Sequence, residues 1–223
     1  MTCMLDFRPD SPNNQFRAAR VERLRSLITA TLAEKSSCRI LDVGGTYNFW
    51  HVWRDKIDWQ RCEVVCVNIN PHHFEQGKDG TRISMIQGNA CNLSNIADKE
   101  FDVVFSNSVI EHVGSWNDKA AMAQEVKRVA KRYLVQTPNY WFPIEPHART
   151  PFLHWLPKPI AYRIVMARKC GFWTKATTVA QAVKSVESAQ MLDYGQMREL
   201  FSEAVIVRER LFGLTKSLMA IKI

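Results

Sequence analysis

A histidine and a glutamate stand two residues apart in a segment rich in proline. His147 and Glu145 belong to the run PIEPHARTP, in which proline fixes the backbone angle φ and so restricts how far the side chains can swing. Histidine changes its charge near neutral pH and therefore suits proton transfer. We interpret His147 as a candidate general base, with Glu145 orienting it or accepting a substrate hydroxyl. A stiff loop with a solvated histidine explains the same residues without any chemistry.

Two further histidines are candidates for the same role. His112 follows Glu111 just after a predicted strand, and His154 lies in the same proline-rich region as His147. His154 is the weakest of the three candidates. No group of His, Asp and Glu residues stands out at metal-ligand spacing, so no metal site is expected.

A glycine-rich turn follows the first predicted strand. The apolar run ILDV delivers Asp42 to a turn at Gly44 and Gly45. Glycine lets the backbone approach a ligand where a Cβ atom would collide. The motif lacks both the third glycine of a dinucleotide fingerprint and the Lys-Ser/Thr pair of a phosphate-binding P-loop. Taken alone, it is also explained as a plain turn between a strand and a helix.

Three more strand ends carry amide side chains. Asn68 ends the second apolar run, where a side chain can reach ribose hydroxyls. Asn89 and Ala90 follow the third run and could meet the edge of an adenine, and Asn107 follows the fourth. Ligands of open α/β sheets bind outside the carboxyl ends of the strands. The spacing of these ends therefore predicts a crevice along one edge of a sheet.

The elements that carry these side chains can be read from apolar periodicity. Residues 15–35 have apolar positions at helical spacing and predict an amphipathic helix, and a second helix is predicted at 117–130. Strands are predicted at 38–43, 63–69, 82–87, 101–106 and 131–138. Almost continuously apolar strands that alternate with helices are typical of a parallel sheet covered on both faces.

The last part of the chain has a different pattern. Residues 193–201 predict a helix, and residues 204–223 hold two strand-like runs joined by a turn near Phe212 and Gly213. Strands joined by so short a turn pair antiparallel. The expected fold class is α/β, with a mostly parallel sheet that ends in an antiparallel C-terminal hairpin.

Residues 139–190 interrupt the alternation of strands and helices. They are rich in proline and aromatic residues and hold helical stretches near 160–168 and 178–186. An insertion after the fifth strand lies at the carboxyl edge of the sheet, where ligands bind. We expect one domain over residues 1–223, with the insertion as a cap on the substrate side. Its bulky apolar side chains are expected to form core, a substrate wall or a lip that faces lipid: Trp141, Phe142, Phe152, Trp155 and Leu156.

Composition narrows the class of protein. No stretch has the roughly 18 to 20 consecutive apolar residues of a membrane span, and the N-terminus lacks the apolar run of a signal peptide. Six cysteines (3, 38, 62, 66, 91 and 170) form no CxxC pair, so we expect reduced, structural cysteines and a cytoplasmic location. The net charge of +8 is spread at helical spacing, which makes nucleic acid the less favoured partner. An anionic small substrate or an anionic membrane surface explains the charge equally well.

Four motifs taken together resemble those of a known family. ILDVGG, VVCVNI and QGNACNLS are weak singly, whereas FDVVFSNSVIEHVG is specific. Over residues 38–138 the chain resembles class I S-adenosylmethionine-dependent methyltransferases of the type 11, small-molecule group. The resemblance implies a Rossmann-like, doubly wound seven-stranded sheet of order 3-2-1-4-5-7-6. It also implies that S-adenosyl-L-methionine binds across the carboxyl edge of this sheet.

The resemblance assigns roles position by position. Asp42, Gly44 and Gly45 match the motif that contacts the amino-acid part of the cofactor. Asn68 matches the position that binds ribose, and Ile69 matches a ring-packing position. Asn89 and Ala90 match the adenine position, and Asn107 matches a loop that lines the methionine. The chain departs from the family where Asn68 replaces a carboxylate, which would make charge-assisted hydrogen bonds, and where the glycine turn continues with Thr-Tyr-Asn.

Methyl transfer from a sulfonium is an in-line displacement, in which the enzyme mainly supplies alignment, and a hydroxyl acceptor benefits from a general base. We predict an O-methyltransferase for a small molecule, sugar or glycolipid, with His147 as the base. Within the family a Glu-His pair like that at His112 more often shapes its loop. An RNA methyltransferase is one alternative, although the chain has neither an NPPY-like motif nor paired catalytic cysteines. A non-catalytic binding or scaffold protein is another, suggested by Asn68.

Overall fold

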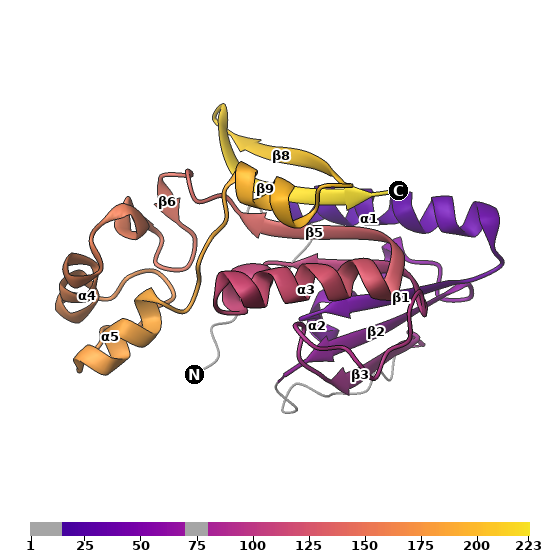
Figure 1. Cartoon of the computed structure of the whole chain (residues 1–223), viewed down its shortest axis with the longest axis horizontal. Helices are drawn as coiled ribbons and strands as arrows, with labels where there is room; N and C mark the ends of the chain where they lie inside the picture. Colours follow the sequence, from indigo (N-terminus) through magenta and orange to yellow (C-terminus); the bar gives the residue numbers. More distant parts are fainter. Residues whose placement is uncertain (1–14, 70–79) are drawn as a thin grey trace.

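The computed structural model describes residues 15–69 and 80–223. In this part a seven-stranded sheet has the order β3-β2-β1-β4-β5-β9-β8 (Figure 1). Because β6 and β7 form a separate small sheet, β8 and β9 are the sixth and seventh strands of this one. The order is then 3-2-1-4-5-7-6, so the topology implied by the resemblance is confirmed. Cys3 lies outside the described residues.

Five strands pair in parallel, and their bounds agree with the predicted runs within one residue. They are β1 (Cys38–Val43), β2 (Cys62–Asn68), β3 (Ile83–Gln87), β4 (Phe101–Asn107) and β5 (Ala130–Pro138). The predicted C-terminal hairpin is confirmed by β8 (Val205–Leu211) and β9 (Leu214–Lys222), which pair antiparallel, and β9 also pairs antiparallel with β5.

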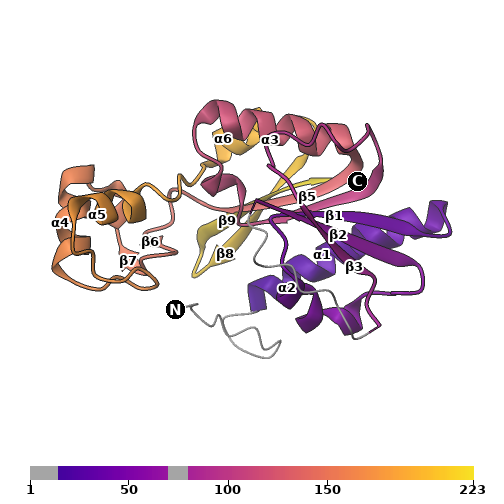
Figure 2. The ribbon, with the colours of Figure 1, turned by 90° about the horizontal axis from the view of Figure 1, so that it is seen from below.

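Helices cover both faces of the sheet (Figure 2). One face packs against α1 (Gln15–Glu34) and α2 (Tyr47–Val52), and the other against α3 (Trp116–Val129) and α6 (Tyr194–Leu200). Because successive strand residues point to opposite faces, Ile40 belongs to the first core and Leu41 to the second. Helix α3 begins at Ser115, which forms a reciprocal capping box with Asp118.

The insertion has a small core of its own and projects to one side of the sheet (Figure 1). It contains β6 (Ile144–Glu145), β7 (Thr150–Pro151), α4 (Lys158–Ala167) and α5 (Val179–Val186), so both predicted helical stretches are present. Two of the five apolar side chains singled out in it, Trp141 and Phe152, are more than half exposed. None of the described helices is long and apolar enough to cross a membrane.

The cysteines of the described part are all free. Four of them are buried and Cys91 is half-buried. A buried free cysteine acts as a small apolar side chain, which agrees with the structural role expected from the sequence.

Candidate active site

The carboxyl ends of the parallel strands meet along one edge of the sheet. Val43 of β1 pairs with Val67 of β2 and with Ser106 of β4, so the residues that follow them, Gly44, Asn68 and Asn107, lie at the same level of the sheet. Asn68 pairs with Gln87 at the end of β3, which continues the edge. The predicted alignment of the strand ends is therefore present, with the glycine turn at its centre.

The glycine turn leaves its backbone bare because side chains would not fit there. Gly44 has a φ of +78°, and a Cβ atom on it would lie 3.0 Å from Val109 Cγ1 and closer still to Cγ2. A Cβ atom on Gly45 would lie 2.8 Å from the Cβ of Asp42 and closer still to its carboxylate. Both glycines are thus required by close packing, and Gly44 by its backbone conformation as well.

A buried carboxyl group lies under this turn. Asp42 is 3% exposed, and Trp50 of α2 donates its Nε1–H to Asp42 Oδ2 at 2.7 Å. Burial raises the pKa of Asp42 to about 8, although the hydrogen bond from Trp50 opposes the shift. A cation bound next to the turn would favour the ionised carboxylate. The hydrogen bond from Trp50 to Asp42 was not predicted from the sequence, because the residues around Trp50 indicate only a buried aromatic side chain.

The amides at the other strand ends differ in how they are held. Asn68 Nδ2 lies 3.5 Å from the carbonyl oxygen of Gly45, and the neighbouring Ile69 is 70% exposed. Asn89 is exposed and accepts the backbone N–H of Cys91 through its side-chain oxygen. The half-buried Ala90 follows it. Ile69 and Ala90 thus offer open apolar surface at the rim, and the cofactor roles of these residues stay predictions.

Asn107 is held from the helix side of the sheet. Its Oδ1 accepts Arg20 Nη1 of α1 at 2.9 Å. The same nitrogen donates to Gln136 Oε1 at 2.9 Å, and the guanidinium forms a buried pair with Glu209, at 2.8 and 2.5 Å. This network was not predicted from the sequence, since Arg20 and Glu209 are 189 positions apart. It fixes the ends of β4 and β5 against α1.

The candidate bases come together on the other side of β5. His147 Nδ1 lies 2.8 Å from Glu145 Oε1, and the other oxygen of Glu145 accepts the backbone N–H of Ala148. Glu145 is 3% exposed and so holds the imidazole ring in a fixed orientation. The ring centroids of His147 and His112 are 4.9 Å apart. Sequence spacing places Glu145 beside His147, whereas the approach of His112 depends on the fold.

Charge near His147 favours its protonated form. Burial alone would lower the pKa of His147, but the hydrogen bond to Glu145 and the negative charges of Glu145 and Glu111 outweigh it and raise that pKa. Because Nδ1 is engaged by Glu145, Nε2 is the ring nitrogen that remains for a further contact.

Glu111 completes the cluster. It is 1% exposed, Thr137 donates to its Oε2 at 3.0 Å, and its Oε1 is buried without a hydrogen-bond partner. His112 uses Nδ1 to bond the carbonyl of Ser188 at 2.7 Å. One ligand atom each of Glu111, His112 and His147 lie within 4.8 Å of one another, a separation that could accommodate a metal ion. No such group was expected from the sequence, because His147 is remote from the other two along the chain.

His154 is engaged elsewhere. Its Nε2 bonds the carbonyl oxygen of Tyr140 at 2.8 Å, while its Nδ1 is buried without a partner. Burial lowers the pKa of His154, so this imidazole stays neutral. It supports the insertion rather than facing the cluster around His147.

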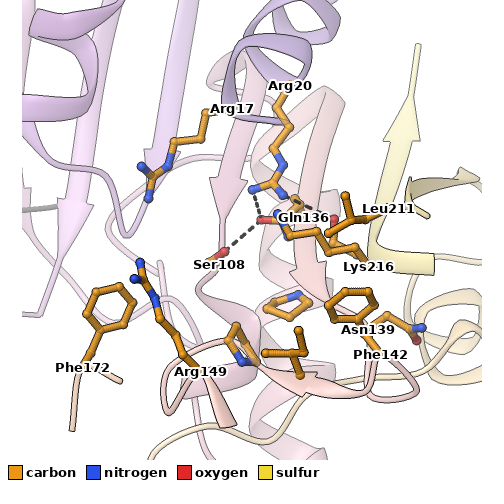
Figure 3. A pocket seen from close by; sticks show the side chains of 14 residues that line it. Arg17, Arg20, Ser108, Gln136, Asn139, Phe142, Arg149, Phe172, Leu211 and Lys216 are labelled. Carbon is orange, nitrogen blue, oxygen red and sulfur yellow. Dashed lines mark hydrogen bonds between the residues drawn. The ribbon is translucent and has the colours of Figure 1, made fainter. Parts of the chain in front are cut away.

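A cavity of about 750 Å³ opens beside these residues, between the sheet edge and the insertion (Figure 3). Its volume lies within the roughly 300–1,000 Å³ typical of small-molecule sites. Pro146 and Arg149, which flank His147 along the chain, belong to its wall, as do Ser108 and Gln136 at the strand ends. The cavity therefore lies at the ends of β4 and β5 and next to the loop that carries His147, although His147 and the glycine turn are not among its lining residues.

Comparison with known proteins identifies this architecture. Residues 41–133 match the family model described as Methyltransferase domain, Methyltransf_11. Residues 41–133 therefore belong to a methyltransferase domain of this family, which covers less than half of the chain. The match to this family agrees with S-adenosyl-L-methionine as the cofactor that the sequence motifs imply. The matched residues run from β1 to β5 and include the glycine turn and the Glu111-His112 segment. No curated protein matches the chain.

Solved structures resemble the fold of this chain at low sequence identity. A protein from Pyrococcus horikoshii OT3 is 18% identical, with a TM-score of 0.55 over 97% of this chain and 92% of that one. The magnesium protoporphyrin IX methyltransferase from Synechocystis PCC 6803, with bound SAH, is 11% identical, with a TM-score of 0.52 over 92% and 84%. A putative sarcosine dimethylglycine methyltransferase from Galdieria sulphuraria is 16% identical, with a TM-score of 0.47 over 84% of this chain. The present chain spans 63% of the length of that last protein.

The residues at the strand ends fit the cofactor. Gly44 and Gly45 form a tight turn in which a Cβ atom would overlap Val109 or Asp42, and the buried carboxyl of Asp42 lies against it. When bound, S-adenosyl-L-methionine supplies an activated methyl group on a sulfonium. Its positive charge and its ammonium group would favour the ionised form of Asp42, whose pKa burial raises.

Proposed function

We propose that this methyltransferase transfers a methyl group to a hydroxyl of a small molecule, sugar or glycolipid, with His147 as general base. The observation that carries the proposal is the Glu145–His147 pair, in which Nδ1 is held at 2.8 Å and Nε2 is left for proton exchange. A carboxylate hydrogen-bonded to an imidazole fixes its tautomer and orientation and stabilises the imidazolium that forms when the ring accepts a proton. We further propose a single domain, with residues 139–190 as a cap over the acceptor, located in the cytoplasm.

Bound S-adenosyl-L-methionine would supply the methyl group to the acceptor oxygen and would leave as S-adenosylhomocysteine. The hydroxyl proton passes to His147 Nε2, and Glu145 stabilises the imidazolium that forms. Glu111 adds a second negative charge near the ring. Gly44, Gly45 and Asp42 hold the cofactor, and Asn68 and Asn89 are the proposed contacts to ribose and adenine. His112 supports the ring of His147 from the side.

The base assignment is tested by replacing His147 with alanine. Turnover is measured as S-adenosylhomocysteine release over a panel of hydroxyl compounds, and cofactor affinity is measured by calorimetry. We expect kcat to fall by about 10² to 10⁴-fold, with the Kd for S-adenosylmethionine near that of the wild type. His154→Ala is the matched control, because His154 lies in the same insertion and its Nε2 bonds the carbonyl of Tyr140. Full activity of His147→Ala would remove it as the base.

The pH dependence gives a second test. A base must be deprotonated to act, so activity should rise with pH through the raised pKa of His147, above the usual value of about 6.5. Glu145→Gln removes the charge that raises this pKa and should move the rise to lower pH. If a chelator abolished turnover and a divalent ion restored it, the cluster of Glu111, His112 and His147 would act through a metal instead, and the base assignment would fail.

RNA is the alternative acceptor, favoured by the net charge of +8. Binding through phosphate contacts weakens steeply with salt. A gel shift with structured RNA at several salt concentrations therefore separates the two: tight, salt-sensitive binding would favour RNA, and its absence favours a small acceptor. Mass spectrometry of the methylated product then identifies the atom that receives the methyl group.

A further inference from the structure

The wall of the cavity carries a surplus of positive charge. Four cationic side chains line it, from α1, the loop between β6 and β7, and β9: Arg17, Arg20, Arg149 and Lys216. No aspartate or glutamate is among the described residues of this wall. The charge of Arg20 is balanced behind the wall by Glu209, which is itself 8% exposed. Figure 3 shows the guanidinium groups of Arg17 and Arg149 directed into the same space.

An irregularity in the hairpin carries Lys216. Between β8 and β9 the pairing passes from Glu209↔Ser217 to Arg210↔Thr215, so Lys216 has no partner on β8. Such a β-bulge bends the strand and redirects a side chain. Lys216 thus lines the cavity, with its ammonium group 3.7 Å from the ring centroid of Phe16. Burial lowers the pKa of Lys216, and the positive charges of Arg20 and Arg17 add to the shift while Glu209 opposes it.

A second irregularity carries Arg149. This residue has a φ of +45°, in the left-handed region that non-glycine residues rarely adopt. Its guanidinium lies 4.3 Å from the ring centroid of Phe172. Phe172 is held by a hydrogen bond from its N–H to the carbonyl of His147, at 2.9 Å, and follows Gly171, where a Cβ atom would collide with the backbone of Ala148. Strained backbone that is kept in a ligand site is a sign of function.

The rest of the wall is mainly apolar. Phe142, Ile144, Phe172 and Leu211 contribute side chains between the cationic groups. A ligand that matches this surface combines an acidic group with an apolar body. The acidic group would meet Lys216 and Arg149 through charge-assisted hydrogen bonds, which are stronger than neutral ones.

We propose that the acceptor of this methyltransferase carries an acidic group, a carboxylate or a phosphate monoester, on an apolar body. Lys216 and Arg149 bind that group and so determine specificity. The inference rests on the proposed function only in placing the acceptor hydroxyl near His147. Recognition of the acid itself depends on the cavity alone.

Binding of matched probes tests the inference. We would titrate 4-hydroxycinnamate and its neutral amide into the full chain with S-adenosylhomocysteine present, and phenyl phosphate in parallel. The amide keeps the ring and the hydroxyl but lacks the charge. We expect the acid to bind at least about tenfold more tightly than the amide, and the phosphate arm shows which acidic group is preferred.

Two variants assign the preference to residues. Lys216→Met should weaken binding of the acid about tenfold and leave the amide unchanged. Lys222→Met is the matched control on the same strand, because Lys222 pairs with Glu203 at 2.9 Å and is not a lining residue. Arg149→Met removes an exposed side chain from a loop, so it serves if the Lys216 variant does not fold.

The outcomes separate the two proposals. The inference is overturned by any of three results: equal affinity for the acid and the amide, no binding of either acid, or an acid preference that survives in both variants. None of these results affects the His147 tests. An acid preference that also holds in His147→Ala supports the inference, even if no hydroxyl proves to be methylated.

Discussion

Replacing Gly44 with alanine should damage the cofactor site by two separable effects. The left-handed φ of +78° costs a residue with a Cβ atom roughly 1–2 kcal/mol. Overlap with the side chain of Val109 adds about 1–3 kcal/mol, as is usual when extra atoms are forced into packed structure. The sum is about 2–5 kcal/mol. The N–H of Gly44 also bonds the carbonyl of Val67 at 2.8 Å, so a shift of the turn would disturb the edge of β2.

The chain provides a control for the backbone effect alone. Gly213 has a φ of +81°, and a Cβ atom added to it would have no neighbour within 4 Å, so Gly213→Ala should lose only about 1–2 kcal/mol. In a protein of this size each kcal/mol lowers the Tm by about 2–4 °C. The Tm of Gly44→Ala should therefore fall further than that of Gly213→Ala.

Calorimetry with S-adenosylmethionine completes the experiment. Gly44→Ala should bind the cofactor at least about tenfold more weakly, whereas Gly213→Ala should bind it normally, because β4 and β5 separate the hairpin from β1 and its glycine turn. Adding Val109→Ala to Gly44→Ala should restore part of the loss by removing the overlapping methyl groups. The reasoning is refuted if Gly44→Ala matches Gly213→Ala in Tm and the wild type in cofactor affinity.

Two more predictions follow from named contacts. Asn68→Asp should keep or improve the affinity for S-adenosylmethionine, because a carboxylate makes charge-assisted hydrogen bonds with ribose hydroxyls; a large loss by calorimetry would mean that another residue meets the ribose. Arg20→Met should lower the free energy of unfolding by about 3–5 kcal/mol, because it leaves Glu209 buried and unpaired. Arg25→Met, which breaks an exposed pair on the same helix, should cost under about 1 kcal/mol; equal denaturant curves for the two variants would contradict this.

The sequence predicted the strands because buried parallel strands are continuous apolar runs with polar ends. The hairpin at Phe212 and Gly213 followed from the short turn. The order of the strands did not follow from periodicity, because pairing between distant segments leaves no local signal. The strand order was instead implied by the resemblance to the methyltransferase family, whose specific motif, FDVVFSNSVIEHVG, contains β4 and the loop after it.

The site was predictable where its residues are close in sequence. Glu145 and His147 were expected to act together, and they do contact each other. Arg20 could not be linked to Glu209, since that contact exists only once β8 and α1 pack together. Lys216 gave no signal because its segment looks like an ordinary strand, and the bulge depends on the pairing register with β8.

The most direct measurement of the account is a structure with S-adenosylhomocysteine bound. We expect the adenine beside Asn89, the amino-acid part over Gly44 and Gly45, and the sulfur directed toward the space between the cavity and His147. A cofactor bound away from the strand ends, or with its sulfur turned away from His147, would contradict the proposed active site.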